Sequence, residues 1–400
     1  MKNILKNITV IGFLFSILIV HAKAQVSSDG LGWIVPGTQL TYYCLTGNLS
    51  DGNSIVPNDD ITAMNNGSSL WKDNTGSDYT LDNNKGAECF LDATVSHIDN
   101  FKACISVKNY GVNSANNQIM APQSMGIQTQ RVKAENYWIS PRVLEKMTNK
   151  NSKDLFVQRL NYNLSGHVYH AVLVRSYNDT GYTNYIYDLA SGVVLHMSQL
   201  TQNPNSIWIR NDSSGTNRSR YQLIETWFKG YRKIGMPWAG QMPPTWVSKT
   251  HQLNYQGFQS TVITGAPVVN IPSSIRVNFN NLNAAYSVVS ISANSNNNFG
   301  SPVMDNSNVV ATSEYGSFWI PSKFLVQMQQ NQVLDINPIT QNRIYVIGVQ
   351  NQQVGIAEVG SGFENRWYYS LSDGILTGFE SISRFGNATV NLHQELVNRN

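Results

Sequence analysis

Residues 137–147 read YWISPRVLEKM, and residues 318–328 read FWIPSKFLVQM. An aromatic residue, Trp, Ile, a basic residue, Leu and Met recur in the same order, and Trp319 follows Trp138 at an offset of 181 residues (319 − 138). Self-similarity at a fixed spacing is the sequence signature of a duplicated structural unit. The two stretches therefore predict that the fold is built twice.

Other segments repeat in the same chain order. Three matches have an offset of 182 residues, and the match nearest the N-terminus has an offset of 213 (252 − 39). They are residues 187–192 with 369–374, Val95 with Val277, Ala103 with Ala285, and residues 39–42 with 252–255. The difference of 31 residues (213 − 182) predicts an insertion in the first copy, a surface loop at about 45–90 that is rich in Gly, Asn and Asp.

The chain of 400 residues is long enough for two such units. We predict a first unit at residues 27–230 and a second unit at residues 246–400. Residues 231–245 between them combine three prolines with two glycines, a density typical of a linker.

Short strands dominate the secondary-structure pattern. The predicted strands are rich in β-branched and aromatic residues and lie between Asn, Gly and Ser clusters. They are residues 168–174, 185–187, 193–197, 274–279, 286–291, 343–349 and 354–359. Ser140 and Pro141 begin an apolar stripe at helical spacing, so a short helix is expected after the Trp. The predicted fold class is mainly β, with α+β as an alternative: two tandem homologous antiparallel-sheet units, each with one short helix packed on its sheet.

Six residues are predicted structural anchors because they recur at matching positions in the two copies. They are Trp138 and Trp319, Tyr187 and Tyr369, and Gly192 and Gly374. The tryptophans are expected to fix the helix to the sheet, because a large aromatic side chain buries much apolar surface. The glycines are expected in hairpin turns that require a left-handed backbone.

The N-terminal residues have the pattern of a secretory signal peptide. Lys2 and Lys6 precede the apolar residues 8–20, and Ala22-Lys23-Ala24 supplies a small-x-small cleavage pattern. This apolar stretch is shorter than the ~20 residues that span a bilayer. We therefore predict that residues 1–24 are removed, that the mature chain has no transmembrane segment, and that it is secreted, periplasmic or at the cell surface.

The charge balance and the motifs exclude several function classes. Removing the three lysines of residues 1–24 leaves 25 basic and 25 acidic residues, so the mature net charge is zero instead of +3. A neutral chain lacks the basic surface of a nucleic-acid binder. The sequence has no nucleotide-binding loop, nucleophile elbow, HExxH or paired CxxC, so no cofactor or metal is predicted. The predicted partner is an unknown extracellular ligand.

All three cysteines lie in the first unit, and export permits a disulfide between two of them. Asp99 and Asn100 suit a turn between two extended segments. We therefore predict a disulfide between Cys89 and Cys104 with Cys44 free, and pairing of Cys44 with either partner is the alternative.

Two histidines are the candidates for chemistry. His167 and His170 are three positions apart, which places them on opposite faces of a strand and disfavours a zinc site. Residues 170–179 resemble the strand that carries the catalytic His of papain-like cysteine peptidases, and this resemblance implies one of the three cysteines as nucleophile. No cysteine has that family's surrounding Gln and Trp, and Gln352 replaces His170 in the second copy.

These observations favour an exported, non-enzymatic protein with a binding, cell-surface or structural role, whose ligand is a glycan, a lipid or a protein. The duplication, the neutral charge and the missing catalytic constellation support this hypothesis. The alternative is a secreted hydrolase, cysteine-peptidase-like or a glycosidase, with His170 as its candidate catalytic residue.

Overall fold

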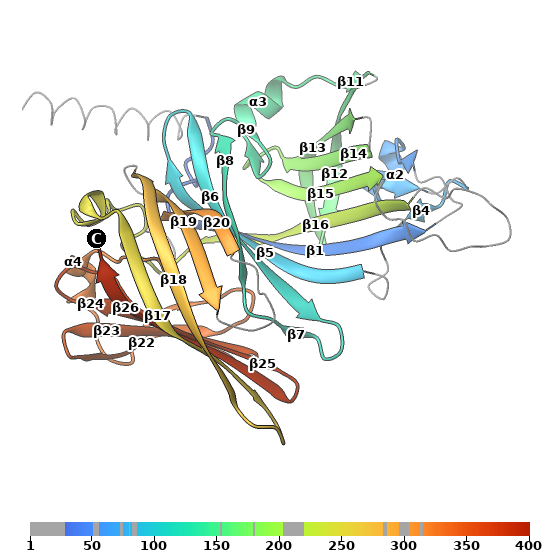
Figure 1. Cartoon of the computed structure of the whole chain (residues 1–400). Helices are drawn as coiled ribbons and strands as arrows, with labels where there is room; N and C mark the ends of the chain where they lie inside the picture. Colours follow the sequence, from blue (N-terminus) through green and yellow to red (C-terminus); the bar gives the residue numbers. More distant parts are fainter. Residues whose placement is uncertain are drawn as a thin grey trace, which may run out of the picture.

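The computed structural model describes residues 29–50, 56–72, 75–79, 81, 86–152, 154–178, 181–202, 220–282, 286–295, 304–311 and 315–400. Within these ranges the chain forms two large antiparallel sheets, one after the other in the sequence (Figure 1). The predicted fold class, mainly β with few and short helices, is confirmed. The predicted signal peptide at residues 1–24 lies outside the described residues.

The first sheet contains eleven strands, and each pairs antiparallel with its neighbours. In spatial order they are β11 (Lys150–Asn151), β12 (Leu155–Leu164), β13 (His167–Asn178), β14 (Gly181–Asp188), β15 (Val194–Gln202), β16 (Arg220–Lys233), β1 (Thr38–Ser50), β5 (Gly86–Ile98) and β6 (Lys102–Asn113), with β7 (Gln118–Ile119) and β8 (Gln123–Arg131) both paired with β6.

The second sheet contains ten strands with the same connectivity. In matching spatial order they are β21 (Val333–Ile336), β22 (Arg343–Gln350), β23 (Gln353–Val359), β24 (Phe363–Ser370), β25 (Leu376–Phe385), β26 (Ala388–Arg399), β17 (Gln252–Ile263), β18 (Val269–Leu282), β19 (Tyr286–Ser295) and β20 (Met304–Ala311). β21 takes the place of β11 and β20 that of β8, so the two units share one topology. Of the strands in the first sheet, β7 alone has no counterpart among the described strands of the second sheet.

The helices follow the two tryptophans, as predicted. Trp138 is the first residue of β10 (Trp138–Ile139), which pairs with β9 (Ala134–Glu135). The helix α3 (Pro141–Lys146) follows β10, and the helix α4 (Ser322–Leu325) follows Trp319. Both indole side chains are completely buried. Each tryptophan also forms an isolated bridge to the residue directly before a strand of its own sheet, Trp138 to Val193 before β15 and Trp319 to Ile375 before β25. This repeated backbone contact supports the predicted role of both residues as anchors.

The glycine of each turn has a physical reason to recur. Gly192 and Gly374 have φ values of 77° and 75°, in the left-handed region that side chains with a Cβ rarely adopt. The Gly192 carbonyl accepts a hydrogen bond from the Ile139 amide at 2.8 Å, and the Gly374 carbonyl accepts one from Ile320 at 2.9 Å. A Cβ on either glycine would lie 1.9 Å from the carbonyl oxygen of Ile139 or Ile320. Only glycine fits this close approach.

One part of the predicted alignment is corrected by two residues. The bulge that follows Val95 in β5 corresponds to the bulge that follows Phe279 in β18, so Val95 matches Phe279 and not Val277. The corresponding match of Ala103 moves by two residues as well, and its predicted partner Ala285 lies outside the described residues. A shift of two residues leaves every side chain on the same face of a strand, so the alternating pattern could not reveal it.

The insertion at 45–90 is not a simple surface loop, contrary to the prediction. β1 and β5 extend into it, and between them lie β2 (Val56–Pro57), α2 (Ile61–Asn65), β3 (Trp71–Lys72) and β4 (Asp78–Tyr79). Met64, Leu70 and Trp71 are buried in the core of the first unit. In the second unit, residues 264–268 alone join the matching strands. The insertion therefore packs on the first sheet, and a connection of five residues takes its place in the second unit.

The predicted linker at 231–245 is also more structured than expected. Residues 231–233 complete β16, and the short 3-10 helix η1 (Val247–Lys249) precedes β17. Ile234, Met236 and Trp238 are buried in the core of the second unit. Apolar residues at alternate positions tie this segment to the second sheet, so the connection between the units is packed.

The predicted disulfide between Cys89 and Cys104 is wrong. Asp99 does begin the turn between β5 and β6, but Cys89 lies opposite Gly111 and Cys104 lies opposite His97. The two cysteines are therefore seven ladder positions apart (111 − 104), about 23 Å along a strand. None of the three cysteines, all of which lie in the described part of the chain, is in a disulfide.

Candidate functional site

One face of the first sheet carries a row of aromatic side chains that crosses five strands. Each member lies directly opposite the next, which places all of them on one face. The row consists of His196 on β15, Trp227 on β16, Tyr43 on β1, Phe90 on β5 and Tyr110 on β6. We refer to these five residues as the aromatic row.

Four rings of the aromatic row, from His196 to Phe90, contact one another in turn. His196 and Trp227 are stacked with centroids 5.1 Å apart, and Trp227 and Tyr43 are stacked at 5.9 Å. Tyr43 and Phe90 follow at 5.4 Å. His196 and Tyr110 at the two ends are buried, whereas the three central rings are only partly buried. The centre of the row therefore offers a partly accessible apolar platform.

A cavity lies at the Tyr110 end of the aromatic row, between the two units. Its volume is about 70 Å³. Its polar and aromatic lining includes Asp92, Lys108 and Tyr110 of the first unit and Asn337, Glu358 and Trp367 of the second. Asp92 lies opposite Lys108, and this pair is two residues along β5 and β6 from the pair of Phe90 and Tyr110. All four side chains are therefore on the same face of the sheet. We call this space the inter-unit cavity, and it continues directly from the aromatic row.

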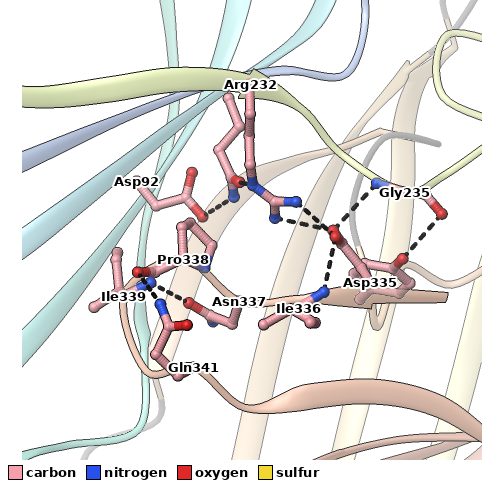
Figure 2. Close-up of polar contacts among 11 residues, drawn as sticks. Asp92, Arg232, Gly235, Asp335, Ile336, Asn337, Pro338, Ile339 and Gln341 are labelled. Carbon is pink, nitrogen blue, oxygen red and sulfur yellow. Dashed lines mark hydrogen bonds and ion pairs between the residues drawn. The ribbon is translucent and has the colours of Figure 1, made fainter. Parts of the chain in front are cut away.

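A chain of hydrogen bonds centred on Arg232 holds the two units together beside this cavity (Figure 2). The Arg232 guanidinium donates to both carboxylate oxygens of Asp335, at 2.6 and 3.0 Å, and its Nε donates to Gln39 Oε1 at 2.7 Å. Gln39 Nε2 in turn donates to Asp92 at 2.6 Å. The Gly235 amide also donates to Asp335, at 3.2 Å. Bidentate Arg–carboxylate pairs fix orientation as well as distance, so the cavity walls are held in a set geometry.

Asn337 makes a second connection between the units. Its Nδ2 donates to the Tyr110 hydroxyl at 3.0 Å and to Glu358 Oε1 at 2.9 Å. Its Oδ1 accepts from the Ile339 amide at 2.9 Å, as Figure 2 shows. Every polar atom of the Asn337 side chain is thereby used, and the amide orients a tyrosine of one unit and a carboxyl of the other.

Burial changes the acidity of the groups that line the cavity. Burial raises the pKa of Asp92 and of Glu358, and the nearby Lys108 ammonium partly offsets both shifts. Burial and the two neighbouring carboxyls also raise the pKa of Tyr110. The tyrosine therefore keeps its proton, and the cavity presents hydrogen-bond donors together with acceptors.

A second polar cluster lies on the same face of the first sheet, beneath the insertion. The insertion supplies Trp71, whose indole donates to Ser198 on β15, and Asp59, which pairs with Arg175 on β13. Arg175 is fully buried and also donates to Asn184 Oδ1 at 2.6 Å. A buried arginine requires such partners, because an unpaired charge in the interior is strongly unfavourable.

Glu225 and His196 face each other in this cluster, with 3.8 Å between Oε1 and Nε2. Burial raises the pKa of Glu225 to about 7, and the Leu81 amide, which donates to the carboxyl, opposes that shift. Burial lowers the pKa of His196 to about 3. The Tyr162 hydroxyl lies 2.8 Å from His196 Nδ1, and Tyr79 approaches Glu225 from the insertion. Between about pH 3 and pH 7 both Glu225 and His196 are therefore uncharged.

The structure does not bring together the residues that the peptidase resemblance implied. His170 is exposed on β13, where its Nδ1 lies 2.8 Å from Asn161 Oδ1. Cys44 lies on β1, the fourth strand along the sheet from β13. His167 is also exposed, and it packs edge-on against Tyr169 at 4.4 Å. The described residues contain no group of three or more His, Cys, Asp or Glu side chains placed to hold a metal ion.

Sequence reasoning did not find the aromatic row or the inter-unit cavity. The members of the row lie at positions 43, 90, 110, 196 and 227, and only strand register places them side by side. The available signal was weak: Tyr43 and Trp227 each stand beside another aromatic residue, Tyr42 and Phe228, and the sequence does not show which residue of each pair shares a face with Phe90.

Comparison with known proteins leaves the function open. No family model and no curated protein matches the chain. One similar solved structure is a protein of unknown function from the DUF3598 family of Nostoc punctiforme, with 8% sequence identity and a TM-score of 0.15 over 89% of this chain and 95% of that chain. A TM-score this low supports no conclusion about fold or activity. No helix in the described part of the chain has the length and apolar character needed to cross a membrane.

Proposed function

We propose that the protein is an exported, non-enzymatic carbohydrate-binding protein. Its ligand lies across the aromatic row and inserts one end into the inter-unit cavity. The observation that carries this proposal is the continuity of the two features, because Tyr110 is both the last member of the row and part of the cavity wall.

The chemistry of the two features suits a sugar chain. A sugar ring has an apolar face of C–H groups, which packs on Trp, Tyr and Phe rings, and hydroxyls that need donors and acceptors at its edge. Trp227, Tyr43 and Phe90 supply the rings. Asp92, Asn337 and neighbouring groups of the cavity supply the polar partners. Such a mixture of aromatic side chains with a few placed polar groups is typical of ligand sites.

The size of the cavity limits what it can accept. An enclosed apolar cavity of about 150 Å³ binds one benzene molecule. The inter-unit cavity, at about 70 Å³, therefore accepts only the tip of a ligand. The remainder of the molecule must lie outside, and the partly accessible rings of the aromatic row are the adjoining surface.

The second unit supports a functional origin for the row. The matching positions there are Gly378, Glu395, Gln256, Ser274 and Asn294, again each opposite the next. None of them is aromatic. Because both units have one topology, the fold does not require aromatic residues in this row, and its presence in the first unit needs another reason.

The test is binding of purified protein to a panel of soluble polysaccharides, by affinity electrophoresis and calorimetry. Trp227→Ala and Phe90→Ala are expected to weaken binding at least about tenfold, the effect of ~1.4 kcal/mol. Phe101→Ala is the matched control, because Phe101 is 82% exposed in the turn between β5 and β6. Thermal melting checks that each variant folds.

Two outcomes would overturn the proposal. Unchanged affinity in both variants would show that the aromatic row is not the binding site. Failure of every polysaccharide to bind would show that the ligand is not a carbohydrate of this kind. Release of new reducing ends during incubation would favour the alternative of a secreted glycosidase over a binding protein.

A further inference from the structure

Cys44 and Cys89 lie directly opposite each other where β1 pairs with β5. Directly opposed residues of antiparallel strands have Cα atoms about 4.5–5.5 Å apart, within the range that a disulfide spans. The Cys44 thiol donates a hydrogen bond to the Cys89 sulfur, so the two sulfur atoms already point toward each other. The strand register therefore places the two cysteines within reach of a disulfide.

The two thiols differ in access and in acidity. Cys44 is only 2% exposed, whereas Cys89 is partly accessible. The hydrogen bond from Cys44 lowers the pKa of Cys89, while the same bond and burial raise the pKa of Cys44. Because the thiolate is the nucleophile in disulfide exchange, Cys89 is the thiol that reacts first.

We propose that Cys44 and Cys89 form a disulfide-forming site that takes a small-molecule disulfide, such as oxidised glutathione, as its oxidant. The Cys89 thiolate attacks one sulfur of the oxidant, whose S–S bond breaks and releases one glutathione thiolate. Cys44 then loses its proton to solvent, and its sulfur attacks the Cys89 sulfur of the mixed disulfide, which releases the second thiolate. Two protein thiols are oxidised to one disulfide, and one oxidant disulfide is reduced to two thiols.

The position of the pair gives the bond a structural consequence. β1 ends at Ser50 and β5 begins at Gly86, so the loop between Cys44 and Cys89 contains the whole insertion. Asp59 and Trp71 of that insertion contact Arg175 and Ser198 on the first sheet. A disulfide between the two strands that flank the insertion reduces the conformational freedom of this segment in the unfolded chain. It also opposes movement of the insertion away from the sheet. The matching pair in the second unit, Gly257 and Ser273, has no insertion to hold.

The experiment uses the full mature chain, reduced and then incubated with oxidised glutathione. The expected result is that titratable thiols fall from three to one per chain, and that non-reducing peptide mapping links Cys44 to Cys89. The melting temperature is expected to rise by several degrees. Trypsin is expected to cleave after Lys72 in the insertion more slowly in the oxidised protein than in the reduced protein.

Three variants make the result specific. Cys44→Ser and Cys89→Ser are expected to lose the cross-link, and Cys104→Ser, the matched control, is expected to keep it. A thiol count that stays at three, a glutathione adduct that persists on Cys89, or a cross-link that includes Cys104 would each overturn the proposal. Because the site needs no carbohydrate, this outcome is independent of the proposed function.

Discussion

Replacing Glu225 by Gln is expected to make the free energy of unfolding depend on pH between 4.5 and 6.5. In the wild-type protein the contributions of Glu225 and His196 to this dependence cancel over the same range. The folded pKa of Glu225 is about 7 and its unfolded value is 4.5, so between these values only the folded state keeps the proton. Its contribution to stability therefore falls as pH rises through that window. His196 has a folded pKa of about 3 against 6.5 unfolded, so its contribution rises with pH from 3 to 6.5.

The two effects oppose each other in the shared window. Each pH unit changes the free energy of unfolding by about 1.4 kcal/mol per proton difference, or about 2.7 kcal/mol over two units. In the wild-type protein Glu225 holds one extra proton in the folded state and His196 one fewer, so their slopes cancel. Glu225→Gln leaves the His196 slope, and stability is expected to rise by about 2.7 kcal/mol from pH 4.5 to 6.5. His196→Gln is expected to give an equal fall.

Urea unfolding followed by tryptophan fluorescence at pH 4.5, 5.5 and 6.5 measures these slopes. Each variant is compared with the wild type, so that titration of all other groups is common to both curves. The double variant Glu225→Gln/His196→Gln is the internal control, and its profile is expected to run parallel to that of the wild type. Parallel profiles for all four proteins would refute the assignment of an uncharged buried pair.

Three further substitutions test the architecture, by chemical or thermal unfolding of the variant and the wild-type protein. Trp319→Ala is expected to cost about 3–5 kcal/mol without loss of ligand binding, because it empties a completely buried aromatic position; a cost below 1 kcal/mol would contradict the anchor role. Gly374→Ala is expected to lower the melting temperature, because its Cβ would overlap the Ile320 carbonyl; an unchanged melting temperature would argue against this turn. Arg232→Met is expected to cost about 2 kcal/mol and to separate the unfolding transitions of the two units, because it leaves Asp335 without its bidentate partner; a single unshifted transition would show that the pair does not couple them.

Local features of the sequence carried the prediction of a duplicated, mainly β fold. Alternating side chains identify strands, and turn glycines identify hairpins, because each depends on a few neighbouring residues. Trp138 with Trp319 and Gly192 with Gly374 were found in this way, since the backbone contact that each pair makes is the same in both units. The two-residue error at Val95 arose because a strand pattern repeats every two residues.

Strand register and packing between distant segments decided the rest. Cys44 faces Cys89, and Tyr110 adjoins the inter-unit cavity, only because particular residues of separate strands lie opposite each other. Likewise, the burial of Trp71 depends on the sheet face that the insertion covers, and not on its own polar neighbours in the sequence. The order of residues along one chain sets local conformation, but pairing between segments that are distant in the sequence depends on the energy of the complete packed sheet.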